Sequence, residues 1–257
     1  MVKVLSLFSG THSIGKVCKQ RGWYEVSLDK DLGSSCALGS DYKSQHHIQE
    51  DIFKWDYKMF PTGYFDIITA SPVCLWWSAL RRTWIGRKLK HMNRPLTAQD
   101  IDNDIDTYGK PMVDKVREII DYFKPKFYWI ENPKTGRMKE YITDLPYYDV
   151  DYCKYSKWGY KKTTRFWTNI KKFIPKKCKK DCENIVKYKN QCHHKTNLCT
   201  NNRKIIDGKM ININTKKLRQ KYKHRSDVSQ KGGSSNRYER YRIPEKLIND
   251  LFDSTEL

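Results

Sequence analysis

A cysteine at the end of a strand is the residue of this sequence best suited to chemistry. Cys74 follows the apolar run Phe65–Ile68, which predicts a buried strand, so the thiol lies where a strand passes into a loop. Ligands and reactive groups collect at the carboxyl ends of strands in open α/β sheets. A thiol there acts as a nucleophile when its surroundings lower its pKa or orient it, and otherwise serves as a small apolar side chain. Other motifs of the sequence are needed to distinguish the nucleophile from the apolar side chain.

The first residues of the chain form a second candidate site. The opening strand runs into Phe8-Ser9-Gly10-Thr11-His12-Ser13-Ile14-Gly15, a glycine-containing turn followed by the start of a helix. Glycine lets the backbone approach a ligand closely, and a helix N-terminus favours anions, so this turn can cradle a nucleotide-like molecule. Asp29 closes the next strand, where a carboxylate can accept hydrogen bonds from ribose hydroxyls. Taken singly, each feature is equally consistent with ordinary turn chemistry.

The elements that must position these residues alternate along the first 170 residues. We expect strands at residues 2–8, 24–28, near 48, 65–69, 127–130, 147–152 and 165–170, and helices at residues 13–21, 111–123 and 243–252. Strands that alternate with amphipathic helices predict an α/β fold with a mostly parallel, doubly wound sheet.

Three later motifs complete a pattern that is known from one family. They are Ser71-Pro72-Val73-Cys74, Trp129-Ile130-Glu131-Asn132-Pro133 and Thr163-Thr164-Arg165-Phe166-Trp167. In this order and spacing the chain resembles the cytosine-C5 DNA methyltransferases, particularly short members encoded by viruses and phages. The resemblance covers residues 4–170 and extends to the closing helix after Tyr241. It implies a Rossmann-like, S-adenosylmethionine-dependent enzyme that methylates C5 of cytosine in DNA.

The resemblance also implies a role for each matching residue. Cys74 would attack C6 of a cytosine that has been flipped out of the duplex, while Glu131 and Arg165 would hold that base. The residues implied to bind S-adenosylmethionine are Phe8, Gly10, Ile14, Gly15, Asp29, Asp51 and Ile52.

Two positions depart from the family pattern. Val73 stands where the family usually has a proline before the cysteine, and Thr163 stands where it usually has the first of two arginines. These departures keep open a weak or inactive nucleic-acid-binding member of the fold. A cytosine-C5 methyltransferase that acts on tRNA is a second alternative, because some relatives of this fold methylate tRNA and composition does not separate the two polymers.

Basic residues are concentrated after the catalytic motifs. The chain has a net charge of +21, and residues 171–225 alone hold 18 lysines and arginines against three acids. Such a block indicates a polyanionic partner, and we expect it to contact DNA. The block also contains Cys178, Cys182, His194 and Cys199, a Cys3His set with zinc-like spacing. Zinc would staple a small module that has little apolar content, whereas the alternative is a set of free thiols in a DNA-binding loop.

These observations predict three parts. Residues 1–170 would form the catalytic domain, with residues 75–110 as a mobile catalytic loop; residues 171–235 would form a small basic target-recognition region, and residues 236–257 a helix that returns to the catalytic domain. No stretch is long and apolar enough for a membrane span. We expect a soluble intracellular monomer, in the cytoplasm or nucleus of the host cell, with reduced cysteines.

Overall fold

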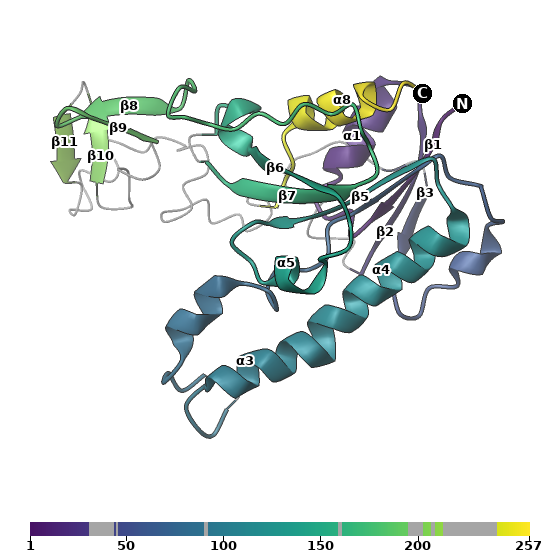
Figure 1. The fold of residues 1–257 in the computed structure, drawn as a ribbon, viewed down its shortest axis with the longest axis horizontal. Coiled ribbons are helices and arrows are strands. Elements are labelled where there is room, and N and C mark those ends of the chain that lie inside the picture. Colours follow the sequence, from purple (N-terminus) through teal and green to yellow (C-terminus); the bar gives the residue numbers. More distant parts are fainter. Residues whose placement is uncertain are drawn as a thin grey trace.

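A seven-stranded sheet forms the centre of the protein (Figure 1). The computed structural model describes residues 1–30, 44, 46–89, 92–158, 161–194, 203–206, 209–212 and 241–257. The strands are β1 (Lys3–Leu7), β2 (Tyr24–Asp29), β3 (His46–Gln49), β4 (Ile67–Ala70), β5 (Phe127–Pro133), β6 (Tyr147–Asp151) and β7 (Thr163–Thr168). Their order is β3-β2-β1-β4-β5-β7-β6, and β7 alone runs opposite to the other six strands. The predicted mostly parallel α/β sheet is confirmed.

Helices cover both faces of this sheet (Figure 1). On one face α1 (Ser13–Gln20) and α8 (Glu245–Asp253) pack with Val4, Ile67 and Trp129 of the strands. On the other face α4 (Lys110–Phe123) presents the apolar residues that the sequence spaces at helical intervals, and α5 (Met138–Tyr141) completes the layer. The helix α3 (Ala98–Asp104) precedes α4 and extends away from the sheet as an arm (Figure 1). Near the C-terminus, Arg21 of the α1 end donates a hydrogen bond of 2.7 Å to Asn249 of α8.

Much of the segment expected as a long loop is helical. Residues 75–110 contain a 3-10 helix (Ala79–Trp84), then α3, then a π-helical turn (Ile105–Gly109) that leads into α4. A reciprocal capping box between Thr97 and Asp100 starts α3. The buried Arg81 pairs with Asp104 at the end of α3, which ties the two helical pieces together. Movement of this segment stays a prediction.

The basic region contributes two hairpins, drawn in green in Figure 1. They are β8 (Ile185–Tyr188) with β9 (Gln191–His194), and β10 (Arg203–Ile206) with β11 (Lys209–Asn212). Among the described side chains, those of β8 and β9 belong to neither hydrophobic core cluster. Two short 3-10 turns, Tyr57–Met59 and Tyr152–Lys154, complete the described elements. Within the described ranges, every helix is too short or too polar to cross a bilayer.

We predict that Gly109→Val destabilises the protein. A Cβ atom at Gly109 would lie 3.0 Å from Cε2 and Cζ2 of Trp77, a side chain that is 1% exposed. Because the indole cannot give way without disturbing the core, we expect a loss of about 1–3 kcal/mol in the free energy of unfolding, measured by urea titration. Thr107→Val, at an exposed position of the same turn, is the matched control. Equal stability of the two variants would contradict this account.

Candidate active site

The strand order reverses between β1 and β4, and the candidate residues gather at the carboxyl ends of these strands and their neighbours. Such a switch point is where open α/β sheets bind their ligands. The backbone N–H of Ser71, after β4, donates to the carbonyl of Leu7 at the end of β1 over 3.3 Å. The glycine turn and the loop that carries Cys74 therefore lie side by side.

The turn after β1 is built from left-handed residues. Phe8, Gly10 and His12 have φ angles of 57°, 45° and 51°. The Gly10 N–H donates a hydrogen bond of 2.8 Å to the Asp29 carboxylate at the end of β2. This contact joins the two predicted cofactor-binding elements directly, and the buried Ile14 and Gly15 follow in the first turn of α1.

The third predicted cofactor element lies at the same edge. The backbone N–H of Glu50 donates to the carbonyl of Asp29 over 3.2 Å, which brings Asp51 and Ile52 beside the end of β2. A hydrogen bond from the backbone N–H of Phe53 outweighs burial and, with Lys30, lowers the pKa of Asp51, so its carboxylate is charged. Ile52 is 5% exposed.

These groups fit a nucleoside with a charged tail. Two carboxylates at strand ends can accept from ribose hydroxyls and an exocyclic amine, and Ile52 offers an apolar surface. Ser9 Oγ in the turn is buried and has no hydrogen-bond partner among the described residues. Burial, with the charges of His47 and Lys16, lowers the pKa of His12 to about 4, so its imidazole stays neutral.

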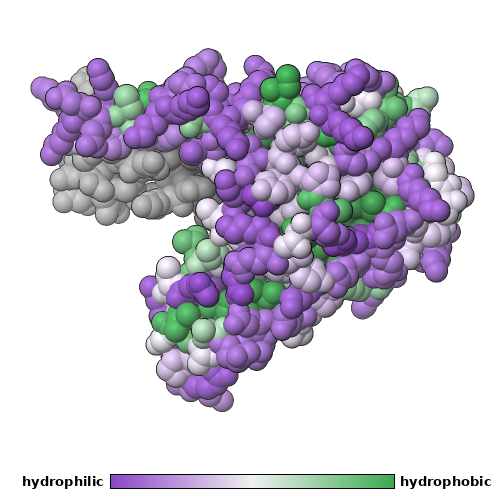
Figure 2. Space-filling view, viewed as in Figure 1, coloured by the Kyte–Doolittle hydropathy of each residue, from purple (hydrophilic) through white to green (hydrophobic). Residues whose placement is uncertain are grey.

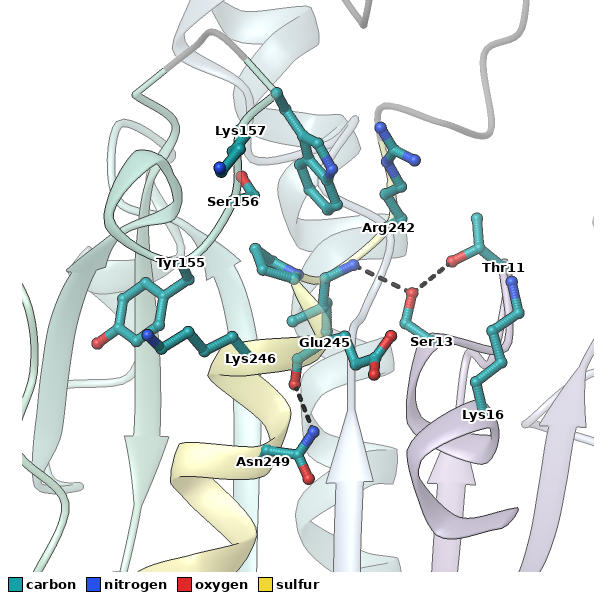
Figure 3. Close-up of a pocket in the computed structure, with 13 residues that line it drawn as sticks. Thr11, Ser13, Lys16, Tyr155, Ser156, Lys157, Arg242, Glu245, Lys246 and Asn249 are labelled. Atoms are coloured by element: carbon teal, nitrogen blue, oxygen red, sulfur yellow. Dashed lines mark hydrogen bonds between the residues drawn. The ribbon is translucent and has the colours of Figure 1, made fainter. Parts of the chain in front are cut away.

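A cavity of about 840 Å³ opens beside this turn, between α1 and α8 (Figure 3). Ser13 Oγ accepts a hydrogen bond of 3.1 Å from the Ile243 N–H and so ties the C-terminal segment to the turn. The basic side chains that line the cavity are Lys16, Lys157, Arg242 and Lys246, with Glu245 as the acid. This excess of positive charge suits an anionic group.

Cys74 begins a tight turn after β4, and neighbouring elements hold that turn in place. The Asn132 side chain donates a hydrogen bond of 2.9 Å to the carbonyl of Pro72, and this contact is buried between β5 and the loop. The backbone N–H of Arg137 donates a hydrogen bond of 2.8 Å to the carbonyl of Trp77 at the other end of the turn. Val73, by contrast, is 43% exposed.

Glu131 is the acidic neighbour of Cys74. Glu131 is 7% exposed, and its carboxyl group accepts a hydrogen bond of 3.1 Å from the Tyr152 hydroxyl. Burial, together with the Glu131 charge, raises the pKa of the Cys74 thiol, and the charge of Lys162 partly opposes this. The structure thus brings Cys74 and Glu131 together and adds Tyr152 and Lys162, which the sequence reasoning missed.

Arg165 has different partners. Its guanidinium donates to the Asp149 carboxylate over 2.8 and 3.2 Å and lies 3.5 Å from the centre of the Tyr147 ring. Arg165 of β7 pairs with Asn132 of β5, so the two side chains leave the sheet on the same face. Because side chains alternate along a strand, Glu131 leaves the sheet on the opposite face. The structure does not show Arg165 in contact with the other two predicted catalytic residues, and its role at the base stays a prediction.

Three of the four predicted metal ligands come together. Cys178, Cys182 and His194 form one cluster, and the fourth member is Cys153, at the turn after β6. Cys199 lies outside the described residues. The sequence carried no spacing signal for Cys153, because 24 residues separate it from Cys178.

The comparisons with known proteins identify the family. No model of a protein family matches the chain. Over 188 residues it is 44% identical to a probable DNA (cytosine-5)-methyltransferase of Frog virus 3 (isolate Goorha), and the alignment covers 72% of this chain and 79% of that protein. The chain belongs to the DNA (cytosine-5)-methyltransferase family. The resemblance drawn from its motifs is confirmed.

One solved structure shows the same fold in a distant protein. The Entamoeba histolytica methyltransferase EhMeth aligns with a TM-score of 0.54 at 10% identity, over 99% of this chain and 98% of that one. A putative DNA modification methyltransferase encoded within an Escherichia coli prophage aligns with a TM-score of 0.45 at 14% identity, over 68% of this chain and 51% of that one.

The second departure from the family pattern has a local structural account. Thr163, in the place of the first family arginine, donates its hydroxyl to the Asp151 carboxylate. Asp151 also accepts from the backbone N–H of Cys178 over 2.8 Å. Through Asp151, Thr163 therefore connects β7 to the segment around Cys178 that follows it.

The geometry predicts that Glu131 controls the reactivity of the Cys74 thiol. Glu131→Gln removes a negative charge that raises the pKa of Cys74, so we expect iodoacetamide to label Cys74 several-fold faster at pH 8. Peptide-resolved mass spectrometry separates this cysteine from the other seven. Glu256→Gln, which removes an exposed carboxylate paired with Lys172, should leave the rate unchanged. An unaltered rate in Glu131→Gln would show that the two groups are not electrostatically coupled.

Proposed function

We propose that this protein transfers the methyl group of S-adenosylmethionine to C5 of cytosine in DNA, with Cys74 as the nucleophile. The observation that supports this most is the proximity of a strand-end thiol and a buried carboxyl group, Cys74 and Glu131, beside the glycine turn after β1. A nucleophile, an acid and a nucleotide-type cradle are the parts that this reaction needs.

The chemistry follows from the weakness of cytosine C5 as a nucleophile. The Cys74 thiolate forms a bond to C6, and the ring electrons move so that C5 can take the methyl group from the sulfonium sulfur. Glu131, sharing a proton, hydrogen-bonds N3 and withdraws negative charge from the ring. A base then removes the C5 proton, and the bond between sulfur and C6 breaks, which restores the thiolate.

We propose that Tyr152 and Lys162 support these two groups. The Tyr152 hydroxyl fixes the Glu131 carboxyl through its hydrogen bond of 3.1 Å. Lys162 lies close enough for its charge to lower the pKa of Cys74 against the effects of burial and Glu131. Arg165, held by Asp149, would anchor the O2 side of the base, as the family resemblance implies.

S-adenosylmethionine supplies the methyl group when bound, and the residues at the strand ends fit it. We propose that Asp29 binds its ribose and that Asp51 and Ile52 hold its adenine. The turn containing Phe8 and Gly10, together with the first turn of α1 at Ile14 and Gly15, would approach its methionine part.

The surface around Cys74 suits a duplex that must give up a base. Leu75, Leu80 and Ile85 are 44%, 71% and 43% exposed. Figure 2 shows hydrophobic side chains gathered over the arm that carries α3. Exposed Arg82 and Arg87 flank them. Apolar side chains can fill the space that a flipped base leaves, while the arginines bind phosphates.

The two hairpins would supply the rest of the contact with DNA. Lys187 and Lys189 of the first hairpin are exposed, in keeping with a role in phosphate binding. We propose that the basic region after residue 170 recognises the target site, and that the protein acts inside the cell, where its substrate is found.

We predict that Cys74→Ser reduces methyl transfer to background while S-adenosylmethionine binding is kept. The hydroxyl cannot form the bond to C6 at a useful rate, so duplex DNA containing 5-fluorocytosine should trap the wild-type chain covalently and not the variant. Tritiated methyl transfer to duplex DNA and to tRNA, in parallel, measures activity and polymer preference. Cys192→Ser, at a partly buried cysteine of β9, is the control. Full activity in Cys74→Ser would exclude the mechanism, and transfer to tRNA alone would exclude DNA as the substrate.

We predict that Lys162→Met shifts the pH profile of kcat/KM. Because the Lys162 charge lowers the pKa of Cys74, its loss should move the rising limb to higher pH and lower the rate near neutrality several-fold, while Lys162→Arg restores the profile. Arg165→Met should instead cost about 2–4 kcal/mol of stability, because it removes a main partner of the buried Asp149. A profile unchanged by Lys162→Met would remove Lys162 from the mechanism.

A further inference from the structure

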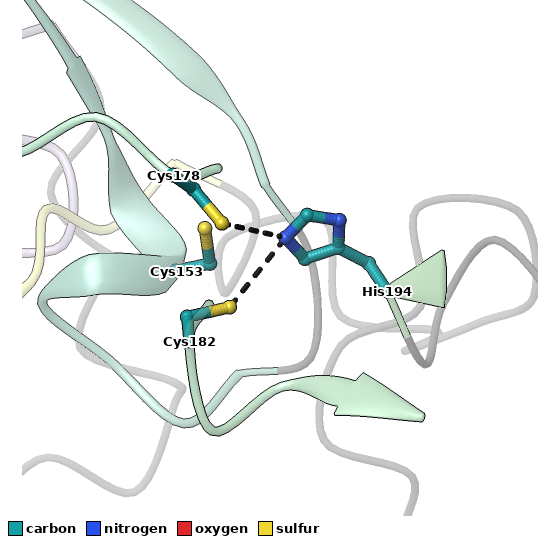
Figure 4. Close-up of side chains that lie close together, drawn as sticks. All are labelled: Cys153, Cys178, Cys182 and His194. Carbon is teal, nitrogen blue, oxygen red and sulfur yellow. Dashed lines mark hydrogen bonds between the residues drawn. The ribbon is translucent and has the colours of Figure 1, made fainter. Parts of the chain in front are cut away.

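Four side chains from three separate segments meet outside the active site (Figure 4). Cys153 comes from the turn after β6, Cys178 and Cys182 from the segment after β7, and His194 from the end of β9. The three sulfurs and one imidazole nitrogen all lie within 4.8 Å of one another. Cys153 and His194 are 4% and 5% exposed, while the other two cysteines are partly buried.

We propose that this cluster is a structural zinc site with Cys153, Cys178, Cys182 and His194 as its ligands. Tetrahedral zinc, with bonds of about 2.3 Å to sulfur and about 2.0–2.1 Å to nitrogen, places neighbouring sulfur and nitrogen ligands about 3.5–3.6 Å apart. The His194 Nε2 atom lies 3.5 Å from Cys178 Sγ and 3.6 Å from Cys182 Sγ. A complete set of four protein ligands is what closes a structural site.

Other arrangements of the same groups use them less fully. A disulfide would join only two of the three sulfurs and leave the third beside the imidazole. Thiols are weak hydrogen-bond donors. Without a metal, the protein therefore gains little stability from placing three thiols and an imidazole around one centre. Zinc binding releases the three thiol protons and adds its binding energy to the folding of the segments that it joins.

Backbone hydrogen bonds hold the ligand loop of the cluster in place. The segment Cys178–Cys182 turns through Lys180, whose φ is 65°, and the N–H groups of Lys180 and Asp181 donate to Cys178 Sγ. The Cys178 N–H donates a hydrogen bond of 2.8 Å to the Asp151 carboxylate at the end of β6. This contact fixes the segment Cys178–Cys182 to the sheet. Hydrogen bonds of this kind orient metal ligands and stabilise thiolates.

The site would anchor the first hairpin to the catalytic sheet. A hairpin of two four-residue strands without a hydrophobic core is marginal by itself. Among the described residues, β8 and β9 contribute nothing to the core clusters. Asn184 provides one tether, donating to the carbonyls of Cys153 and Ser156 over 3.0 and 2.8 Å. Zinc on His194 would provide the other, on the second strand at the same open end of the hairpin, where His194 pairs with Ile185.

Metal analysis of the purified full-length chain tests this proposal. Protein from zinc-supplemented cells, prepared without chelators, should hold a single zinc ion per chain by inductively coupled plasma mass spectrometry. Cys153→Ser and Cys182→Ala should lose it, whereas Cys182→His, which restores a nitrogen ligand, should keep it. Cobalt in the wild-type chain should show the thiolate charge-transfer and tetrahedral d–d bands, a readout that does not depend on any variant folding.

Two matched cysteines serve as controls. Cys192→Ser should keep the zinc, because Cys192 is described and does not belong to the cluster. Cys199→Ser should keep it as well, because the proposed set of four ligands is complete without Cys199. A wild-type chain without stoichiometric zinc or the cobalt bands would overturn the proposal. Loss of zinc in Cys199→Ser, with retention in Cys153→Ser, would also overturn it and favour the ligand set expected from the sequence. None of these readouts depends on methyl transfer, so the zinc site and the proposed activity can fail independently.

Discussion

The hydrogen bond from the Asn132 side chain to the carbonyl of Pro72 is the contact on which the candidate active site depends. It is buried, so its loss would leave a backbone carbonyl unpaired away from water, at a cost of about 1–3 kcal/mol. Glu131 precedes Asn132 on β5, and Cys74 follows Pro72 by two residues. One amide therefore fixes the distance between the strand that carries the acid and the loop that carries the thiol. This explains in physical terms why an asparagine follows the glutamate in the Glu-Asn-Pro motif.

With that distance fixed, Cys74 and Glu131 cannot easily both be charged. Burial and the Glu131 carboxylate raise the pKa of Cys74, so the thiol of the free protein keeps its proton. A cytosine that accepts a hydrogen bond at N3 changes this balance, because Glu131 must then hold or share a proton. In the proposed mechanism, the negative charge of the pair would then move to sulfur, where the Lys162 charge would stabilise it. The proximity of Glu131 keeps the Cys74 thiol protonated in the free protein. When the substrate base binds, the same proximity would favour the reactive thiolate.

The sequence predicted the parts of this site that depend on local pattern. Apolar spacing located the strands and α4, and the placement of Cys74, Glu131 and Asp29 at strand ends followed from them. It did not predict the contacts of Arg165, because its pairing with Asp149 depends on the register of β6 against β7. Side-chain alternation makes a shift of one residue reverse the face, and nothing local in the chain specifies that register.

The metal ligands show the same limit at longer range. Cys199 was expected as the fourth ligand because it is near His194 in sequence, whereas the described cluster contains Cys153, 41 positions before His194. Cys153 reaches the cluster because β6 and the segment after β7 lie side by side at the edge of the sheet. The proximity is tertiary, so a spacing rule for zinc ligands has no means of finding it. Helical content in residues 75–110 was missed for a related reason, since the buried Arg81 is neutralised by Asp104, 23 residues away.

Three consecutive residues at the end of β6 connect the two sites. Asp151 accepts from the backbone of Cys178, Tyr152 donates to Glu131, and Cys153 joins the cluster. A displacement of this turn must therefore disturb the acid that faces the thiol as well as the ligands that hold the first hairpin. If zinc fixes Cys153, it also limits how far the Tyr152 hydroxyl can move from the Glu131 carboxyl. The proposed metal would then stabilise the geometry of the candidate active site as well as the attachment of the region proposed to recognise DNA, although it touches neither substrate.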